Sequence, residues 1–163
     1  MIMPDKTKQQ IERDEQIYQL TTLVAGDFSL QEALDKLAEA AVKTVGVKAC
    51  SIRLLDEGAS DLKMRSTYGL SEEYRNKGVV SKNDTVVKAA FAGEAVVLDD
   101  MRVDGRVKYK DATIKEGLVS QLTVAMHFKG RATGVLRLYS PEPKRFDEDD
   151  INLARAVASQ CAV

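Results

Sequence analysis

The sequence predicts an α+β domain in which an antiparallel sheet is covered by helices. Two segments with a helical spacing of apolar residues come first, and a third closes the sequence. Between them, four segments with alternating apolar residues are arranged as two hairpins. Hairpins pair antiparallel, and helices outside the hairpin region can pack together on one face of the resulting sheet.

Length and charge indicate one ordinary domain with no polyanionic partner. The chain has 163 residues, and its 24 Lys and Arg nearly balance its 25 Asp and Glu, for a net charge of -1. No net field therefore favours nucleic acid or an anionic membrane. No apolar run reaches the roughly 18 residues of a membrane span, and "MIMPDKTKQQ" lacks the apolar part of a signal peptide. We expect a cytoplasmic protein in which Cys50 and Cys161 are reduced.

Three segments have the pattern of amphipathic helices. The first spans Thr7 to Ala25 and contains no Gly or Pro. In the second, "SLQEALDKLAEAAVKTVG", Ser29 and Glu32 form a capping-box pattern before a regular apolar stripe. The third, "FDEDDINLARAVASQCAV", begins at Asp147, whose carboxylate suits a helix N-terminus. We expect residues 1–28 to form an N-terminal helix for dimerisation or linkage, and residues 29–163 to form the domain proper.

The middle of the chain changes from helical to alternating spacing. "KACSIRLLDEGASDLKMRSTYGLS" predicts two strands around the turn "DEGASD", and "QLTVAMHFKGRATGVLRLYS" predicts a second hairpin. Between them lie "SEEYRNKG", a short helix or loop, "NDTVVKAAFAGE", a short helix that begins at Asn83 or Asp84, and "AVVLDD", a further strand. The polar stretch "MRVDGRVKYKDATIKEGLVS" has room for one helical turn and is longer than a plain connection, as binding loops and lids often are.

The two faces of the predicted sheet differ in composition, because side chains alternate along a strand. One face is purely apolar and should lie under the second and last helices; it contains Cys50, Ile52, Leu54, Leu122, Val124, Met126, Phe128, Leu136 and Leu138. The other is mixed, with Ala49, Ser51, Arg53, Leu55, Thr123, Ala125, His127, Val135, Arg137 and Tyr139. The mixed face is either solvated or the wall of a cavity. We favour the cavity, because the segments between Gly69 and Ser120 need a surface on which to pack.

Several stretches, in this order and spacing, resemble a GAF domain from about Leu30 to the end. They are "EALDKLAEAAVKTVGVKACSIRLLDE", "STYGLSEEY", "AAFAGEAVVLDD", "EGLVSQLTVAMHFKGRATGVLRLYS" and "RFDEDDINLARAVASQCAV". The resemblance implies a sheet of about six strands, N- and C-terminal helices on one face, and loops and short helices over a small-molecule pocket on the other.

The resemblance and the strand alternation together predict the residues of the pocket. The resemblance places Ser51, Tyr68, Thr85, Val86 and Thr123 at ligand-facing positions, and we expect the long polar stretch from Asp104 to Ser120 to form a lid over the pocket. Strand alternation adds Arg53 and Arg137. These two arginines either reach to water or recognise a carboxylate or phosphate group, for which a guanidinium offers paired donors.

The residues needed for several chemistries of similar domains are missing from the sequence. Residues between Gly69 and Ser120 include no Cys, which bilin attachment and methionine sulfoxide reduction use in the lid. The string "KRFDEDD" fits a helix start better than the Asn-Lys-Phe-Asp-Glu set of cyclic-nucleotide-binding members. His127 is the sole histidine, which excludes a His-based triad or a zinc site with several His ligands; it is either an exposed or core-edge residue or a haem ligand. We expect no catalytic residues and no metal site.

The expected function is that of a non-catalytic sensory or regulatory domain in a signal-transduction protein. It would bind a small molecule, an anion if Arg53 and Arg137 recognise it, and relay binding to an output domain such as a kinase, cyclase or transcription regulator. A homodimer joined through Thr7 to Ala25 and the terminal helix would carry the signal. The alternative is a ligand-free dimerisation or interaction scaffold whose cavity is filled by its own side chains.

Overall fold

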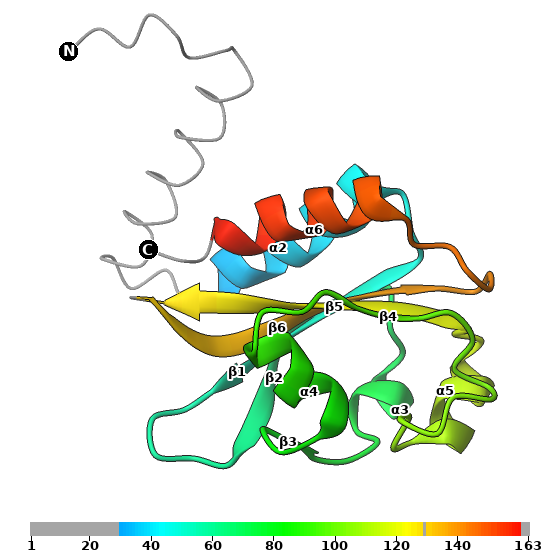
Figure 1. Cartoon of the computed structure of the whole chain (residues 1–163), viewed down its shortest axis with the longest axis horizontal. Helices are drawn as coiled ribbons and strands as arrows, with labels where there is room; N and C mark the ends of the chain where they lie inside the picture. The colour runs from blue at the N-terminus through cyan, green and yellow to red at the C-terminus, as the bar shows by residue number, and fades with distance from the viewer. Residues whose placement is uncertain (1–29, 129, 161–163) are drawn as a thin grey trace, which may run out of the picture.

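The computed structural model describes residues 30–128 and 130–160, and its centre is a six-stranded antiparallel sheet with helices on both faces (Figure 1). Strand β1 pairs with β2 and β6, so the first hairpin joins the second at the middle of the sheet. The predicted α+β architecture with about six strands is confirmed. In spatial order the strands are β3 (Val80–Ser81), β2 (Asp61–Tyr68), β1 (Ala49–Leu55), β6 (Arg131–Ser140), β5 (Ser120–Phe128) and β4 (Val96–Leu98).

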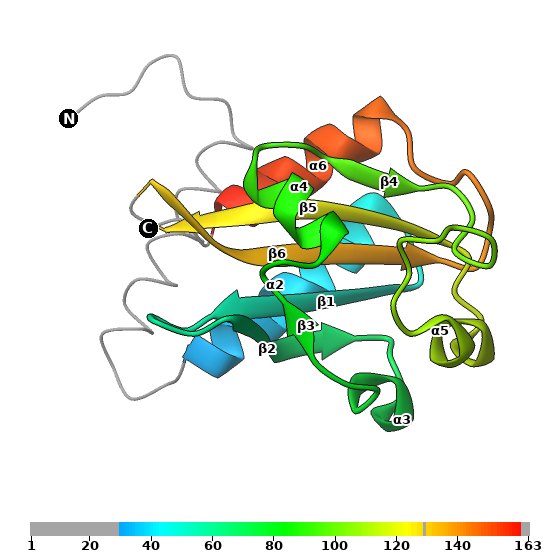
Figure 2. The ribbon, with the colours of Figure 1, turned by 60° about the horizontal axis from the view of Figure 1, so that its bottom comes forward.

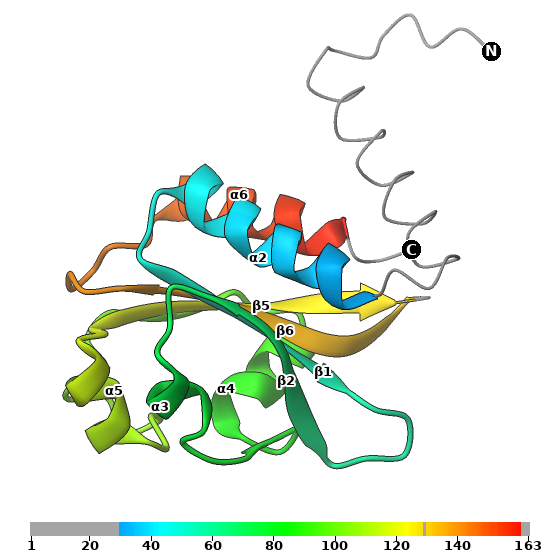
Figure 3. The same cartoon turned by 180° about the vertical axis from the view of Figure 1, so that it is seen from behind.

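The apolar face of the sheet lies under α2 (Leu30–Val45) and α6 (Glu148–Ser159), which run antiparallel beside each other (Figure 3). The α2 stripe predicted from the sequence is buried, with Leu34 and Leu37 at 2% and 4% exposure. It packs with sheet residues such as Leu136 into one continuous core. Burying a leucine side chain contributes about 1.5–3 kcal/mol, which is why an amphipathic helix of this kind is stable here.

The mixed face lies under three short helices and the loops that join them, α3 (Glu72–Arg75), α4 (Thr85–Phe91) and α5 (Lys110–Glu116) (Figure 2). A second apolar cluster fills the space between these helices and the sheet. Tyr139 of β6 is fully buried in it. The mixed face is therefore covered rather than solvated.

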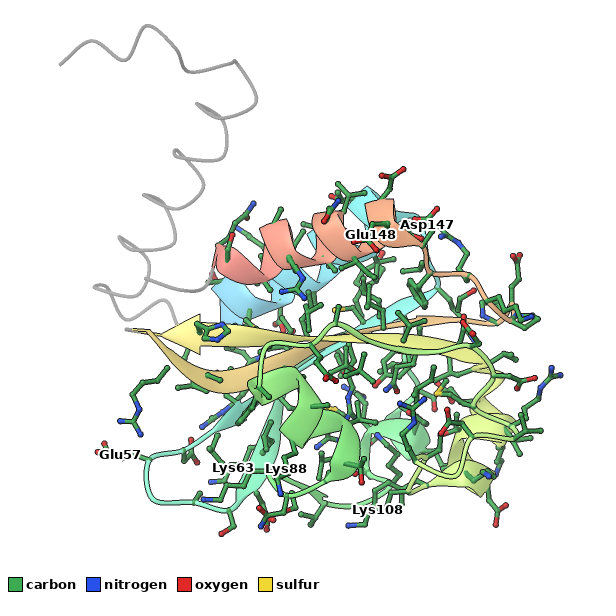
Figure 4. The ribbon with its side chains drawn as sticks, viewed as in Figure 1. Glu57, Lys63, Lys88, Lys108, Asp147 and Glu148 are labelled. Carbon is green, nitrogen blue, oxygen red and sulfur yellow. The ribbon has the colours of Figure 1, made fainter. Side chains whose placement is uncertain are left out.

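Arg145 joins the end of α2 to the start of α6. Its Nη1 atom lies 2.8 Å from Oδ2 of Asp150 in the first turn of α6, and its Nη2 atom donates to the carbonyl of Val45, the last residue of α2, at 3.0 Å. Asp147, labelled in Figure 4, caps α6 and forms a reciprocal capping box with Asp150. One guanidinium thus serves an unpaired carbonyl of one helix and a first-turn carboxylate of the other.

Most predicted elements appear where the sequence placed them, and one strand was missed. The two hairpins, the helix at "NDTVVKAAFAGE", now capped by Asp84, and the helical turn in "DATIKEG" are all present. The missed strand is β3, whose two residues pair with Asp61 and Leu62. The predicted helix over Thr7 to Ala25, the Ser29 cap and Cys161 lie outside the described residues.

Candidate functional site

A small cavity lies between the mixed face of the sheet and the short helices, with a volume of about 40 Å³. Arg137 and Gln121 of the sheet line it on one side. Tyr74 of α3 and Lys77, just beyond α3, line it on another, and Val86 of α4 contributes apolar surface. The remaining lining residues are those from Arg106 to Tyr109, Thr113 of α5, Val80, Asp84 and Leu98.

Two arginines are buried at the base of this site. Arg137 is 7% exposed and Arg53, which lies next to the cavity without lining it, is 3% exposed. Among the described residues, Nε of Arg137 and both Nε and Nη2 of Arg53 are buried without a hydrogen-bond partner. A buried donor left unpaired costs about 1–3 kcal/mol, so the site holds donor groups in excess of the acceptors around them.

The nearest carboxylate neutralises these arginines only in part. Oδ1 of Asp84 lies 3.9 Å from Nη2 of Arg137, at the limit of an ion pair. The same oxygen accepts hydrogen bonds from the backbone N–H groups of Val86 and Val87, at 3.0 and 3.2 Å, as the cap of α4. Arg53 has one weak interaction, a donation from Nη1 to the carbonyl of Leu62 at 3.4 Å.

Lys77 brings a third basic group to the same place. Its Nζ atom lies 3.9 Å from the centroid of the Tyr74 ring and donates to the Tyr74 carbonyl at 3.4 Å. Burial, together with the positive charges of Arg53 and Arg137, lowers the pKa of Lys77 to about 7. Burial likewise lowers the pKa of Arg53, with a smaller effect of the Arg137 charge. The three groups are therefore close enough to repel one another.

The covering segment is held down by polar contacts at its margins. The hydroxyl of Tyr109 donates to the carbonyl of Val79 at 2.5 Å. Gly78 makes this close approach possible, because a Cβ there would lie 2.6 Å from Cε1 of Tyr109. Further along, Glu116 accepts from both the backbone N–H and the hydroxyl of Ser71, at 2.7 and 2.6 Å. These contacts tie the segment between 104 and 120 to the region around α3.

The sequence matches the GAF domain family over residues 29–163. The chain belongs to the GAF family. Its fold is similar to the GAF domain of a phosphoenolpyruvate-protein phosphotransferase from Acinetobacter, with 20% identity, a TM-score of 0.67, and coverage of 95% of this chain and 91% of that one. It is also similar to a GAF domain/HD domain protein from Geobacter sulfurreducens, with 15% identity, a TM-score of 0.68, and coverage of 82% and 90%.

A third similar structure is an enzyme. The free methionine-R-sulfoxide reductase from Neisseria meningitidis, solved in complex with its substrate, is 18% identical with a TM-score of 0.63, and the match covers 98% of this chain and 94% of that one. At such identities the likeness concerns the fold. Comparison with curated proteins gives no match.

The GAF domain brings some of the residues predicted for its pocket together and separates others. Arg137 and Val86 line the cavity, and Arg53 is buried next to it. Ser51 and Thr123 flank Arg137 in register on the neighbouring strands and are fully buried without lining the cavity. The hydroxyl of Ser51 lies 3.0 Å from that of Tyr139, and Thr123 accepts from Gln121 at 3.1 Å.

Thr85 and Tyr68 do not lie in the cavity lining. Thr85 is exposed at the start of α4. Tyr68 is 38% exposed and pairs with Cys50, whose side chain lies in the core beneath α2 and α6. Because directly paired residues share a face of an antiparallel sheet, Tyr68 points toward the helix-covered side.

Sequence reasoning missed Lys77, Tyr74, Asp84 and Tyr109. All four lie outside the strands, where side-chain alternation gives no direction. One signal was available in "SEEYRNKG", where a lone Tyr in a charged run marks a helix with one buried side. The predicted lid was closer to the structure, because Arg106 to Tyr109 and α5 do lie over the cavity.

The remaining reactive residue types lie elsewhere. His127 is exposed on β5, at a separate hollow next to α6. Cys50 is fully buried, and burial raises the pKa of its thiol, as expected for a cysteine that packs as a small apolar residue. Within residues 30–128 and 130–160, no cluster of His, Cys, Asp and Glu could hold a metal ion, and no helix is long and apolar enough to cross a membrane.

Proposed function

We propose that this GAF domain is a non-catalytic sensor that binds a small anionic molecule in the cavity beneath the segment from Asp104 to Ser120. The observation that carries the proposal is the pair of buried arginines with unpaired donors, Arg53 and Arg137. An anion with two or more oxygens would accept hydrogen bonds from these donors and offset the repulsion between the two guanidinium groups. Such a ligand would accept from donors that no described protein group accepts from.

The covering segment supports a role in sensing. Its contacts with the α3 region include Glu116 with Ser71 and Lys115 with Glu73, the latter at 2.7 Å between side chains that are each 70% exposed. Exposed ion pairs contribute only about 0–1 kcal/mol, so the pair of Lys115 and Glu73 can form when a ligand binds and separate when it leaves. Closure over a bound anion would then change the surface around α5.

Relay to an output domain is supported by the setting of similar domains. A GAF domain/HD domain protein and a methyl-accepting chemotaxis protein are among the similar structures. We propose that this chain acts in the same way, as a cytoplasmic homodimer joined through Thr7 to Ala25 and the terminal helix, and coupled to an output such as a kinase, cyclase or transcription regulator. Thr7 to Ala25 lies outside the described residues, whereas the terminal helix is described as α6 through Ser159.

The anion proposal is tested by thermal unfolding of the full chain with a panel of metabolites. Carboxylates and phosphate monoesters should raise the melting temperature, whereas neutral aromatic compounds should not. Arg137→Gln should abolish the shift, because it removes the charge that lines the cavity. Arg131→Gln, at an exposed position beside the β5–β6 turn, should leave the shift unchanged. Stabilisation by neutral ligands alone, or equal shifts in both variants, would contradict the proposal.

The small cavity favours a second candidate, a ligand-free dimerisation or interaction scaffold. A volume of about 40 Å³ leaves room for little more than a few atoms while the lid is closed. Native mass spectrometry of the purified chain separates the two candidates, because a sensor retains or accepts a small molecule and a scaffold does not.

Dimerisation is tested by light scattering on the intact chain and on a chain that lacks the residues before Phe28. We expect a dimer in the first case and a monomer in the second. An intact chain that is monomeric, or a shortened chain that is still dimeric, would remove the basis for a relay through the terminal helices.

A further inference from the structure

We infer that the cavity selects an anion with two negative charges on one compact head group, namely a phosphoryl group. Lys77 is the third cationic side chain that binds it, after Arg53 and Arg137. This inference rests on the proposed anion site and specifies its ligand class. The phosphoryl group can belong to a phosphate monoester or to free phosphate, which share the same head-group chemistry.

The charges around the cavity call for a dianion. Arg53, Arg137 and Lys77 supply three positive charges when Lys77 is protonated, and the carboxylate of Asp84 supplies one negative charge next to Arg137. Arg106, which also lines the cavity, is already paired with Asp104 at 2.8 Å. Lys108, which also lines the cavity, is offset by the charge of Glu116 near Lys77, so two positive charges are left without a partner. A monoanion would leave one of them buried and unpaired, which is costly in a site of low dielectric.

The size of the cavity favours a ligand whose negative charges lie on one head group. Its volume of about 40 Å³ holds only a few water-sized groups, because one water molecule needs roughly 10–15 Å³ of cavity. The two carboxylates of a dicarboxylate are separated by a carbon chain and would need a much larger space. A phosphoryl group places its oxygens on a single centre, which suits a small cavity next to guanidinium donors.

The protonation state of Lys77 depends on the charged groups around its amine, and a bound anion would be one of them. The groups around it come from every neighbouring element: Arg53 of β1, Arg137 of β6, Tyr74 of α3 and Glu116 of α5, with Asp84 at the start of α4 and Lys108 and Tyr109 in the covering segment. With the cavity empty, burial and the two arginines hold the pKa of Lys77 at about 7. A bound dianion favours the charged amine and raises that pKa, so binding takes up a proton.

The test is isothermal titration calorimetry of the full chain with sodium sulfate at pH 6 and pH 8. Sulfate remains a dianion across this range, so any pH dependence comes from the protein. Because Lys77 is charged at pH 6 and mostly neutral at pH 8, the association constant should fall about ten-fold between the two pH values. Nitrate, a monoanion, should bind at least ten-fold more weakly than sulfate at pH 6.

Two substitutions assign the effect to Lys77. Lys77→Gln should weaken sulfate binding at pH 6 and remove the pH dependence, whereas Lys77→Arg keeps its charge and should bind sulfate equally well at pH 6 and pH 8. Lys88→Gln is the matched control, because Lys88 is exposed on α4 (Figure 4) and should behave like the unsubstituted chain. Methyl phosphate that binds more tightly than inorganic phosphate would identify a monoester as the ligand type, and the reverse order would identify free phosphate.

Failure of this inference is distinct from failure of the proposed function. Sulfate binding that is independent of pH and unchanged in Lys77→Gln, or nitrate binding as tight as sulfate binding, would overturn the role of Lys77 and the choice of a dianion while the anion site stands. If no anion binds, and Arg137→Gln changes no ligand response, the anion site itself is wrong.

Discussion

Replacing Gly78 by alanine should destabilise the domain by loosening the covering segment. Gly78 has φ = +147°, a conformation that L-residues rarely adopt, and its missing Cβ leaves the space that the Tyr109 ring fills. Backbone strain of this kind costs about 1–3 kcal/mol. Displacing the ring also breaks the bond from the Tyr109 hydroxyl to the Val79 carbonyl, which is worth about 1 kcal/mol. The free energy of unfolding should therefore fall by about 2–4 kcal/mol.

Urea unfolding of four variants separates strain from the clash with the ring. Gly58→Ala is the control for backbone conformation, because Gly58 has φ = +76° and nothing lies within 4 Å of an added Cβ; it should cost about 1–2 kcal/mol. In a Tyr109→Ala background the cost of Gly78→Ala should drop by about 1 kcal/mol or more, since the ring is gone. If Gly78→Ala costs the same with and without Tyr109, the ring does not pack on the glycine as described.

Two further predictions concern the opposite face of the sheet. Leu136→Ala, at a fully buried position in the core beneath α2 and α6, should lower the free energy of unfolding by about 2–5 kcal/mol in urea, and a loss under 1 kcal/mol would mean that this core is not closely packed. The hydrogen bond from the backbone N–H of Asp150 lowers the pKa of the capping residue Asp147 below its ordinary value of 3.8. The Asp147 carboxylate therefore contributes its full stabilisation above pH 3.8. This stabilisation is lost as the pH falls through the lower pKa of the folded state. Unfolding curves of the unsubstituted chain and Asp147→Ala should therefore differ at pH 6 and converge in strong acid, and a constant difference across pH would contradict this role.

The fold could be predicted well because the strands alternate so regularly. The apolar row that includes Ile52 and Leu136 requires a helix layer, and α2 and α6 supply it. Strand alternation also placed Arg53 and Arg137 on the other face, next to the cavity. Strand β3 was missed because two residues are too few to show any alternation, and its pairing depends on the position of the preceding loop.

The candidate site was less predictable, for two physical reasons. Lys77 and Tyr109 come from irregular segments, and only tertiary packing decides that a lysine in a polar stretch turns toward the sheet. Tyr68 lies on the helix-covered side because the pairing register of β1 and β2 shifts between Ile52 and Arg53, and family likeness alone does not locate such an irregularity. Which predicted residues bind a ligand stays a prediction.

Arg145, with its contacts to Val45 and Asp150, is a fixed point between α2 and α6. It fastens α2 to α6 at one end of the pair, while the first turn of α2 and the last turn of α6 lie together at the other end (Figures 1 and 3). The 12 residues of α6 span about 18 Å, so a rotation of about 5° around this junction would move its far end by about 1.5 Å. A small change in the angle between the two helices would therefore produce its largest displacement at the end farthest from Arg145. That end is the first turn of α2 and the last turn of α6.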